Sequence, residues 1–190
     1  MKKVLFPAVI ILITALWLSC AKQKTTVEFD IPYSTDIAIP SMTVGNTYTF
    51  NTPSVMTNIN DELSKNGTNG NLIGEVKYTQ FDIAVKSPTV GQTLSFIRSV
   101  KFYIDVPTLP EQQVAYKYNQ SKTAGPNGTT INDTIKPTDK STTLHYNDPN
   151  LKGRFMETGI YFKYQIDPIY STPPMTITVT HVVHVKGISE

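Results

Sequence analysis

The sequence predicts an all-β protein in which two antiparallel sheets pack as an immunoglobulin-like β-sandwich, with one or two short helices. About eight segments alternate apolar and polar residues, the period of two that is typical of a half-buried strand. Turn-forming residues separate these segments, and the strand–helix alternation of a parallel sheet is absent from the sequence. A closed barrel is the main alternative.

The first strands are expected before residue 51. Residues 27–31 alternate apolar side chains with two acids, which predicts a half-buried strand. Residues 37–39 lie between Pro32 and Pro40 and predict a short, separate second strand. Residues 48–50 are rich in β-favouring aromatic and threonine side chains and predict a third.

A short helix is expected next. Asn58 suits the position that caps a helix N-terminus, and Asp61 and Glu62 suit the first turn, where acids favour the helix dipole. The glycine- and asparagine-rich run 66–71 follows and would end the helix. We therefore expect about two helical turns.

A long strand is expected over residues 72–86, with a change of frame inside it. Val76 and Tyr78 lie on even positions, whereas Phe81 and the apolar residues after it lie on odd ones. One extra residue in a strand produces such a change, so a β-bulge is predicted near Thr79–Gln80.

The rest of the chain continues the strand pattern. A helical turn is expected over 151–156, and His145 lies in an expected edge strand. The remaining strands are predicted at 94–104, 114–118, 160–166 and 175–185, with short edge strands and loop over 129–143.

The N-terminus has the order of parts of a bacterial secretory signal. Lys2 and Lys3 provide positive charge, and residues 4–18 carry none. This apolar stretch is shorter than the roughly 20 residues that a membrane-spanning helix needs. The chain is therefore expected to be exported.

Residues 16–20, Leu-Trp-Leu-Ser-Cys, resemble the lipobox of bacterial lipoproteins. Trp17 stands where that family usually has leucine. The resemblance implies a signal peptide over 1–19, fatty-acyl chains such as palmitate on Cys20, and a polar tether over 20–26. The single β-sandwich domain would then span 27–190. Two alternatives are ordinary cleavage after Ala21 and an uncleaved N-terminal anchor.

The resemblance also implies a location. Two or more acyl chains give stable membrane attachment. Ala21, in place of aspartate, favours the outer membrane, and the basic tether favours its periplasmic leaflet over the cell surface. The domain is similar to small Bacteroidota lipoproteins, a group with no established activity. The similarity is diffuse and rests on residues 50–63, 81–104 and 151–185.

Composition limits the partners of the mature chain. Without Lys2 and Lys3, basic and acidic residues balance at 15 each, so the basic field that nucleic-acid binding requires is missing. Cys20 is the only cysteine, and its acylation would leave no thiol for disulfide or redox chemistry. A membrane partner is expected through the lipid, and no nucleic acid.

The histidines do not predict a metal site, and no cofactor is expected. His181 and His184 are three residues apart, a spacing that places them on opposite faces of a strand. His181 lies on the apolar face and is expected to be a hydrogen-bonded core residue. The sequence contains none of the common nucleophile motifs, so we expect a protein that is not an enzyme.

Tyrosines are the remaining candidates for a binding role. Tyr103, Tyr116 and Tyr118 lie on predicted strands and are possible ligand-facing residues, although tyrosine is also simply favoured in strands. The sequence predicts a non-catalytic binding or scaffolding lipoprotein whose ligand is unknown, with a protein or a glycan as its partner. The alternative is a glycan-binding or glycan-processing accessory protein. Three exposed coplanar aromatic rings would favour the glycan, and a free sheet edge or apolar patch would favour a protein.

Overall fold

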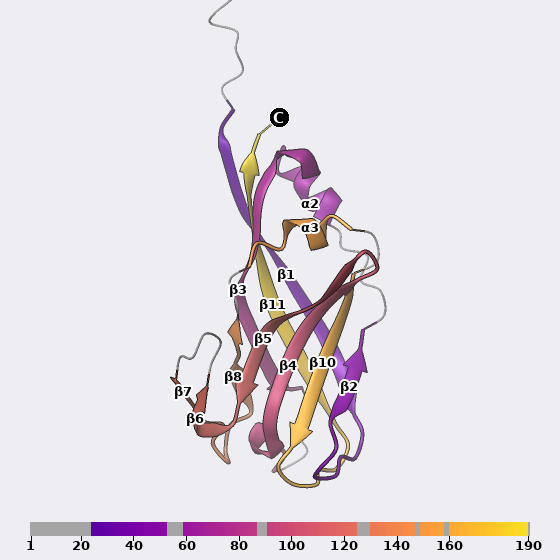
Figure 1. The fold of residues 1–190 in the computed structure, drawn as a ribbon, viewed down its shortest axis with the longest axis vertical. Coiled ribbons are helices and arrows are strands. Elements are labelled where there is room, and N and C mark those ends of the chain that lie inside the picture. Colours follow the sequence, from indigo (N-terminus) through magenta and orange to yellow (C-terminus); the bar gives the residue numbers. More distant parts are fainter. Residues whose placement is uncertain are drawn as a thin grey trace, which may run out of the picture.

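Two antiparallel sheets pack face to face in the computed structural model, which confirms the predicted sandwich (Figure 1). The structure describes residues 24–52, 59–86, 91–124, 130–146, 149–157 and 160–189. One sheet has four strands in the order β1-β11-β3-β8, the other has five in the order β2-β10-β4-β5-β9, and β6 and β7 pair with each other. The strands are β1 (Thr26–Ile39), β2 (Tyr48–Asn51), β3 (Ile73–Val85), β4 (Ile97–Val106), β5 (Leu109–Tyr118), β6 (Gln120–Ala124), β7 (Thr130–Asp133), β8 (Ser141–Thr143), β9 (His145–Tyr146), β10 (Tyr161–Pro168) and β11 (Met175–Ile188).

Short helices cover one end of the sandwich. Helices α2 (Ile59–Lys65) and α3 (Lys152–Phe155) lie at the end where β1 begins and β11 finishes (Figure 1). They confirm the two predicted helical segments, while the expected cap Asn58 lies outside the described residues. Two 3₁₀ turns, η1 (Gly70–Leu72) and η2 (Leu94–Phe96), precede β3 and β4. The prediction of strand from residue 94 was therefore wrong by three residues.

Pro32 does not divide the first strand, contrary to the prediction of two short strands. β1 continues through it for 14 residues and pairs with β11 along its whole length, without a shift in register. Among the strands that the structure describes, β1 has β11 as its only neighbour, so it is an edge strand. An edge position accommodates proline, because one side of the strand needs no N–H for the sheet.

The predicted bulge in β3 is confirmed. Val182 of β11 pairs with Gln80, and the next residue, Val183, pairs with Tyr78, which leaves Thr79 as the extra residue. The bulge turns both Tyr78 and Phe81 into the core, where they are 2% and 0% exposed.

Aromatic rings fill the space between the sheets. Phe81, Phe102 and Phe162 are at most 1% exposed, and the centroids of the Phe81 and Phe102 rings lie 4.4 Å apart. Burial of one such side chain stabilises the fold by about 1.5–3 kcal/mol. This aromatic centre surrounds His181, which is fully buried.

Acidic side chains of β1 face basic side chains of β11 across the outer face of the four-stranded sheet. Glu28 lies directly opposite Lys186, and their charged atoms are 2.7 Å apart. Asp30 lies opposite His184 at 2.8 Å. The hydrogen bond from Lys186 lowers the pKa of Glu28. Such cross-strand pairs favour the observed register of β1 on β11.

Candidate functional site

The three candidate tyrosines share one surface, the outer face of the five-stranded sheet. Phe102 faces the core, so Tyr103 beside it on β4 faces outward. Tyr116 pairs with Lys101 and Tyr118 with Ser99, so both lie on this same face. Tyr116 is only 4% exposed, whereas Tyr103 and Tyr118 are half-buried.

Tyr103 is engaged by its neighbours on the sheet. Its hydroxyl donates a hydrogen bond of 3.1 Å to Oε1 of Gln165. The Nζ atom of Lys163 lies 4.9 Å from the centre of its ring, in cation–π range, and also pairs with Glu111. Partial burial raises the pKa of Tyr103. One face of this ring is therefore already occupied by an ammonium group.

Tyr116 and Tyr118 form a small aromatic group with His145. The ring centres of the two tyrosines lie 5.6 Å apart, and those of Tyr116 and His145 lie 5.7 Å apart. The tyrosine planes are inclined by 49°, so the rings are not coplanar. With Tyr116 buried as well, the three candidates do not present one flat stacking surface.

Lys117 points into the sandwich, which the sequence analysis missed. It pairs with Val100, and Ala115 pairs with Phe102, so both residues of β5 face the core side of the sheet. The register skips from Ala115 to Gln113, which makes Val114 a bulge residue. The lysine side chain is only 10% exposed. No local signal distinguishes this lysine from the solvent-facing lysines of other strands.

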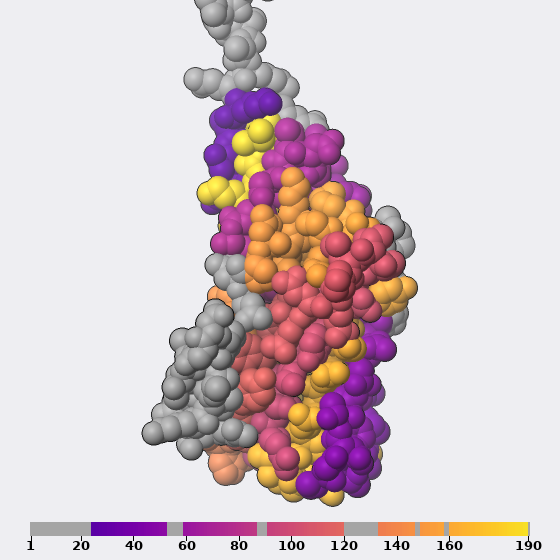
Figure 2. Space-filling view, viewed as in Figure 1, coloured from indigo at the N-terminus to yellow at the C-terminus, as the bar shows by residue number. Residues whose placement is uncertain are grey.

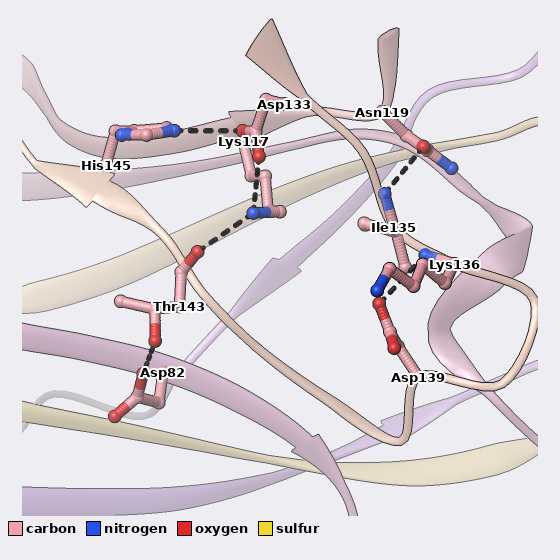
Figure 3. Close-up of polar contacts among 9 residues, drawn as sticks. All are labelled: Asp82, Lys117, Asn119, Asp133, Ile135, Lys136, Asp139, Thr143 and His145. Carbon is pink, nitrogen blue, oxygen red and sulfur yellow. Dashed lines mark hydrogen bonds and ion pairs between the residues drawn. The ribbon is translucent and has the colours of Figure 1, made fainter. Parts of the chain in front are cut away.

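A polar network around Lys117 links all three sheets (Figure 3). Nζ of Lys117 lies 2.5 Å from Oδ1 of Asp133 on β7 and donates a hydrogen bond of 3.2 Å to the carbonyl oxygen of Thr143 on β8. Nε2 of His145, on β9, lies 3.1 Å from the other oxygen of Asp133. The hydroxyl of Thr143 donates to Oδ1 of Asp82 at 2.6 Å.

This network joins β7 to the two sheets of the sandwich. The carboxylate of Asp133 is 6% exposed, and the ammonium group of Lys117 neutralises it within the protein. Buried charges persist only when they are paired in this way. Asn119 secures the same region, because its Oδ1 accepts a hydrogen bond of 2.8 Å from the backbone N–H of Ile135 (Figure 3). The two charges of this pair neutralise each other, and the pair holds β7 to the sandwich.

His181 lies in the aromatic centre, as the pattern of β11 predicted, but it is not hydrogen-bonded. Its ring lies 4.9 Å from that of Phe162 and 5.3 Å from that of Phe81. Within the described part of the chain, neither ring nitrogen has a hydrogen-bond partner. Desolvation lowers the pKa of His181 to about 3, so the ring is neutral. His184 lies on the opposite face, as predicted.

A cleft of about 380 Å³ opens on one side of the sandwich, between the ends of β1 and β2. Residues 35–38 of β1 form one margin, residues 49–51 of β2 and Thr52 after it form the other, and Tyr164 of β10 lies against the cleft. Figure 2 shows the strand β2 and the loop before it as the purple surface at the lower right. The two margins are edge strands of different sheets.

Cys20, the predicted lipid-attachment residue, lies outside the described residues. Of the helices that the structure describes, none combines the length and hydrophobicity that crossing a bilayer requires. Nor do three or more histidine, cysteine, aspartate or glutamate side chains gather at one possible metal site in the described ranges.

No protein-family model matches the chain, and no curated protein matches it significantly.

Proposed function

We propose that this protein is a membrane-anchored envelope lipoprotein whose β-sandwich is a non-catalytic binding or scaffolding domain. The lipid is carried by Cys20, and the domain faces the periplasm from the outer membrane. The supporting observation is the position of β1, which begins at Thr26, six residues after Cys20, at the end of the sandwich that carries α2 and α3 (Figure 1).

The tether then sets the distance of the domain from the bilayer and the orientation of the domain. Six residues span at most about 20 Å when extended. The end with α2 and α3 therefore lies next to the bilayer, and the loop between β1 and β2 lies at the far end. That far end carries three of the large apolar side chains that remain exposed: Val44, Ile169 and Tyr170. Exposed apolar groups at the membrane-distal end suit a protein partner.

Val44 and Tyr170 come from two loops that are held together. Met42 and Thr172 exchange two backbone hydrogen bonds of 3.1 Å. These bonds hold the two loops side by side at the membrane-distal end. Glycan binding, the second candidate, receives less support because the three predicted tyrosines form no flat exposed surface.

The test is the fate of the chain when Cys20 is replaced. Cys20→Ala should move the protein from the membrane fraction to the soluble periplasmic fraction, and Ala21→Ser, which keeps the cysteine, should leave it in the membrane. Intact-mass measurement of the native protein should show an acylated chain that begins at Cys20. A bare polypeptide beginning at Lys22, or membrane retention of Cys20→Ala, would refute lipid attachment.

A further inference from the structure

The free edge of β1 presents unpaired backbone groups toward the cleft. The N–H of Ser189 donates a hydrogen bond of 2.8 Å to the carbonyl of Thr25, and the register with β11 has no shift. Odd-numbered residues of β1 therefore bond to β11, and even-numbered residues point their N–H and C=O away from it. Pro32, which lacks an N–H, lies at an even position, as this pattern requires.

The other margin of the cleft, formed by β2, also presents unpaired backbone groups. The N–H of Thr52 donates a hydrogen bond of 2.8 Å to the carbonyl of Phe162, and Asn51 lies opposite Lys163. By the same alternation, the backbone groups of Thr49 and Asn51 point away from β10. The cleft is thus bordered by two rows of backbone donors and acceptors that have no partner among the described residues.

A buried tyrosine with an unpaired hydroxyl group also lines the cleft. Tyr164 lines the cleft and is 1% exposed, and its hydroxyl oxygen has no hydrogen-bond partner in the described ranges. Buried polar atoms are normally paired, because an unpaired one costs about 1–3 kcal/mol. The side chain of Phe50 supplies apolar surface beside it. An extended backbone fits these features, since it offers alternating donors and acceptors.

Charge indicates the partner's chemistry. β1 contains three acids, Glu28, Asp30 and Asp36, and no basic residue. Their side chains remain 43%, 59% and 42% exposed despite their ion pairs. A second copy paired antiparallel about Pro32 would bring Glu28 opposite Asp36, which is unfavourable. A strand with basic residues at alternate positions would instead face these acids.

We propose that the free edge of β1, at its cleft with β2, binds an extended peptide segment of a partner protein that carries lysine or arginine at every second position. This proposal deepens the binding function proposed above and rests on it. The segment adds a strand to the four-stranded sheet by backbone hydrogen bonds. Its basic side chains lie on the outer face beside Glu28, Asp30 and Asp36, and its other face covers the cleft.

The test uses the full-length protein in detergent and a fluorescein-labelled nine-residue peptide that alternates lysine with threonine. Fluorescence polarisation should show saturable binding that weakens as salt is raised. Two control peptides should not bind: one with glutamate in place of lysine, and one of the same composition with the lysines clustered. Binding of the clustered peptide with equal affinity would show attraction by charge alone and overturn the proposal.

A proline at a position whose N–H points away from β11 distinguishes binding by edge pairing from other modes of peptide binding. Ser34→Pro removes an N–H that β11 does not use and should weaken peptide binding at least about tenfold. Ser34→Ala keeps the N–H and should bind as the unchanged protein does. Ala38→Pro is a second variant in case Ser34→Pro fails to fold, which circular dichroism would reveal. Unchanged affinity of a folded proline variant would overturn the proposal, as would the absence of binding by the unchanged protein.

Sedimentation of the protein alone tests whether a second copy of the chain covers the free edge of β1. Self-association that Ser34→Pro abolishes would show that a second copy covers the edge and would overturn the basic partner. The outcome for Cys20→Ala is separate, because peptide binding in solution does not require the anchor. Loss of anchoring with peptide binding intact would refute the proposed membrane location and leave the strand site standing.

Discussion

Lowering the pH from 7.5 to 4.5 should destabilise the folded domain through His181. Its pKa is about 3 in the folded protein, against an ordinary value of about 6.5. Between these two values the unfolded chain binds a proton that the folded chain does not, so stability is present above pH 6.5 and is lost as the pH falls toward 3. At about 1.36 kcal/mol per pH unit, the loss between pH 7.5 and 4.5 is about 2.5 kcal/mol.

Acids that are ion-paired on the sheet surface contribute only at the low end of this window. Hydrogen bonds from Lys186 and Lys86 lower the pKa of Glu28 and Asp36 in the folded state, from ordinary values of 4.5 and 3.8. Their contribution to stability is therefore present above these ordinary values and is lost as the pH falls through them. A variant at position 181 keeps these acids, so its stability difference from the unchanged protein isolates His181.

The assay compares the unchanged protein with His181→Phe by urea unfolding at several pH values. Phenylalanine suits a site surrounded by aromatic rings and cannot be protonated. Far-UV circular dichroism is the appropriate signal, because the only tryptophan, Trp17, lies in the predicted signal peptide. The stability difference between the two proteins should shift by about 2.5 kcal/mol in favour of the variant as the pH falls from 7.5 to 4.5.

The matched control is His184→Phe, on the same strand but on its outer face. It should retain the pH dependence that His181 causes. A constant offset between the unchanged protein and His181→Phe would reflect packing alone. Parallel curves across the whole pH range would therefore refute a neutral, desolvated imidazole in the core.

Three further predictions concern stability, each measured by urea unfolding. Asp133→Ala leaves Lys117 buried without its counter-ion and should cost about 3 kcal/mol, whereas combining it with Lys117→Met should recover most of that loss; equal costs for the single and double variants would contradict a buried pair. Gly187→Ala would place a Cβ atom 2.9 Å from the carbonyl oxygen of Leu72 and should cost about 1–3 kcal/mol; no change would contradict this close approach. Deletion of Thr79 removes the bulge but leaves Tyr78 and Phe81 two positions apart, both facing the core in one continuous register with β11, and should therefore preserve cooperative folding; loss of the unfolding transition would argue against Thr79 as the extra residue.

The features that depend on the residue pattern of a single strand could be predicted from the sequence. The change of frame around Thr79 predicted the bulge, and the alternation along β11 separated His181 from His184. Pro32 was misleading, because a proline tolerated at a sheet edge resembles one that ends a strand. Edge position depends on strand order, which local alternation does not encode.

Features that depend on two strands together could not be predicted. Val114 looks like an ordinary strand residue, and only its pairing with β4 shows that it is a bulge that turns Lys117 inward. Asp133, the partner of that lysine, lies on a different hairpin and carries no signal of burial. His181 was expected to have a hydrogen bond because buried polar groups usually do, but aromatic rings surround it instead.

The direction of β1 has a mechanical consequence. A pull between the proposed N-terminal tether and a partner bound at the opposite end of the sandwich would act along the axis of this strand. All of its backbone bonds to β11 would then be sheared together, not peeled apart one after another, since the two strands pair over 14 residues without interruption. A strand pair loaded in this direction resists tension along its length.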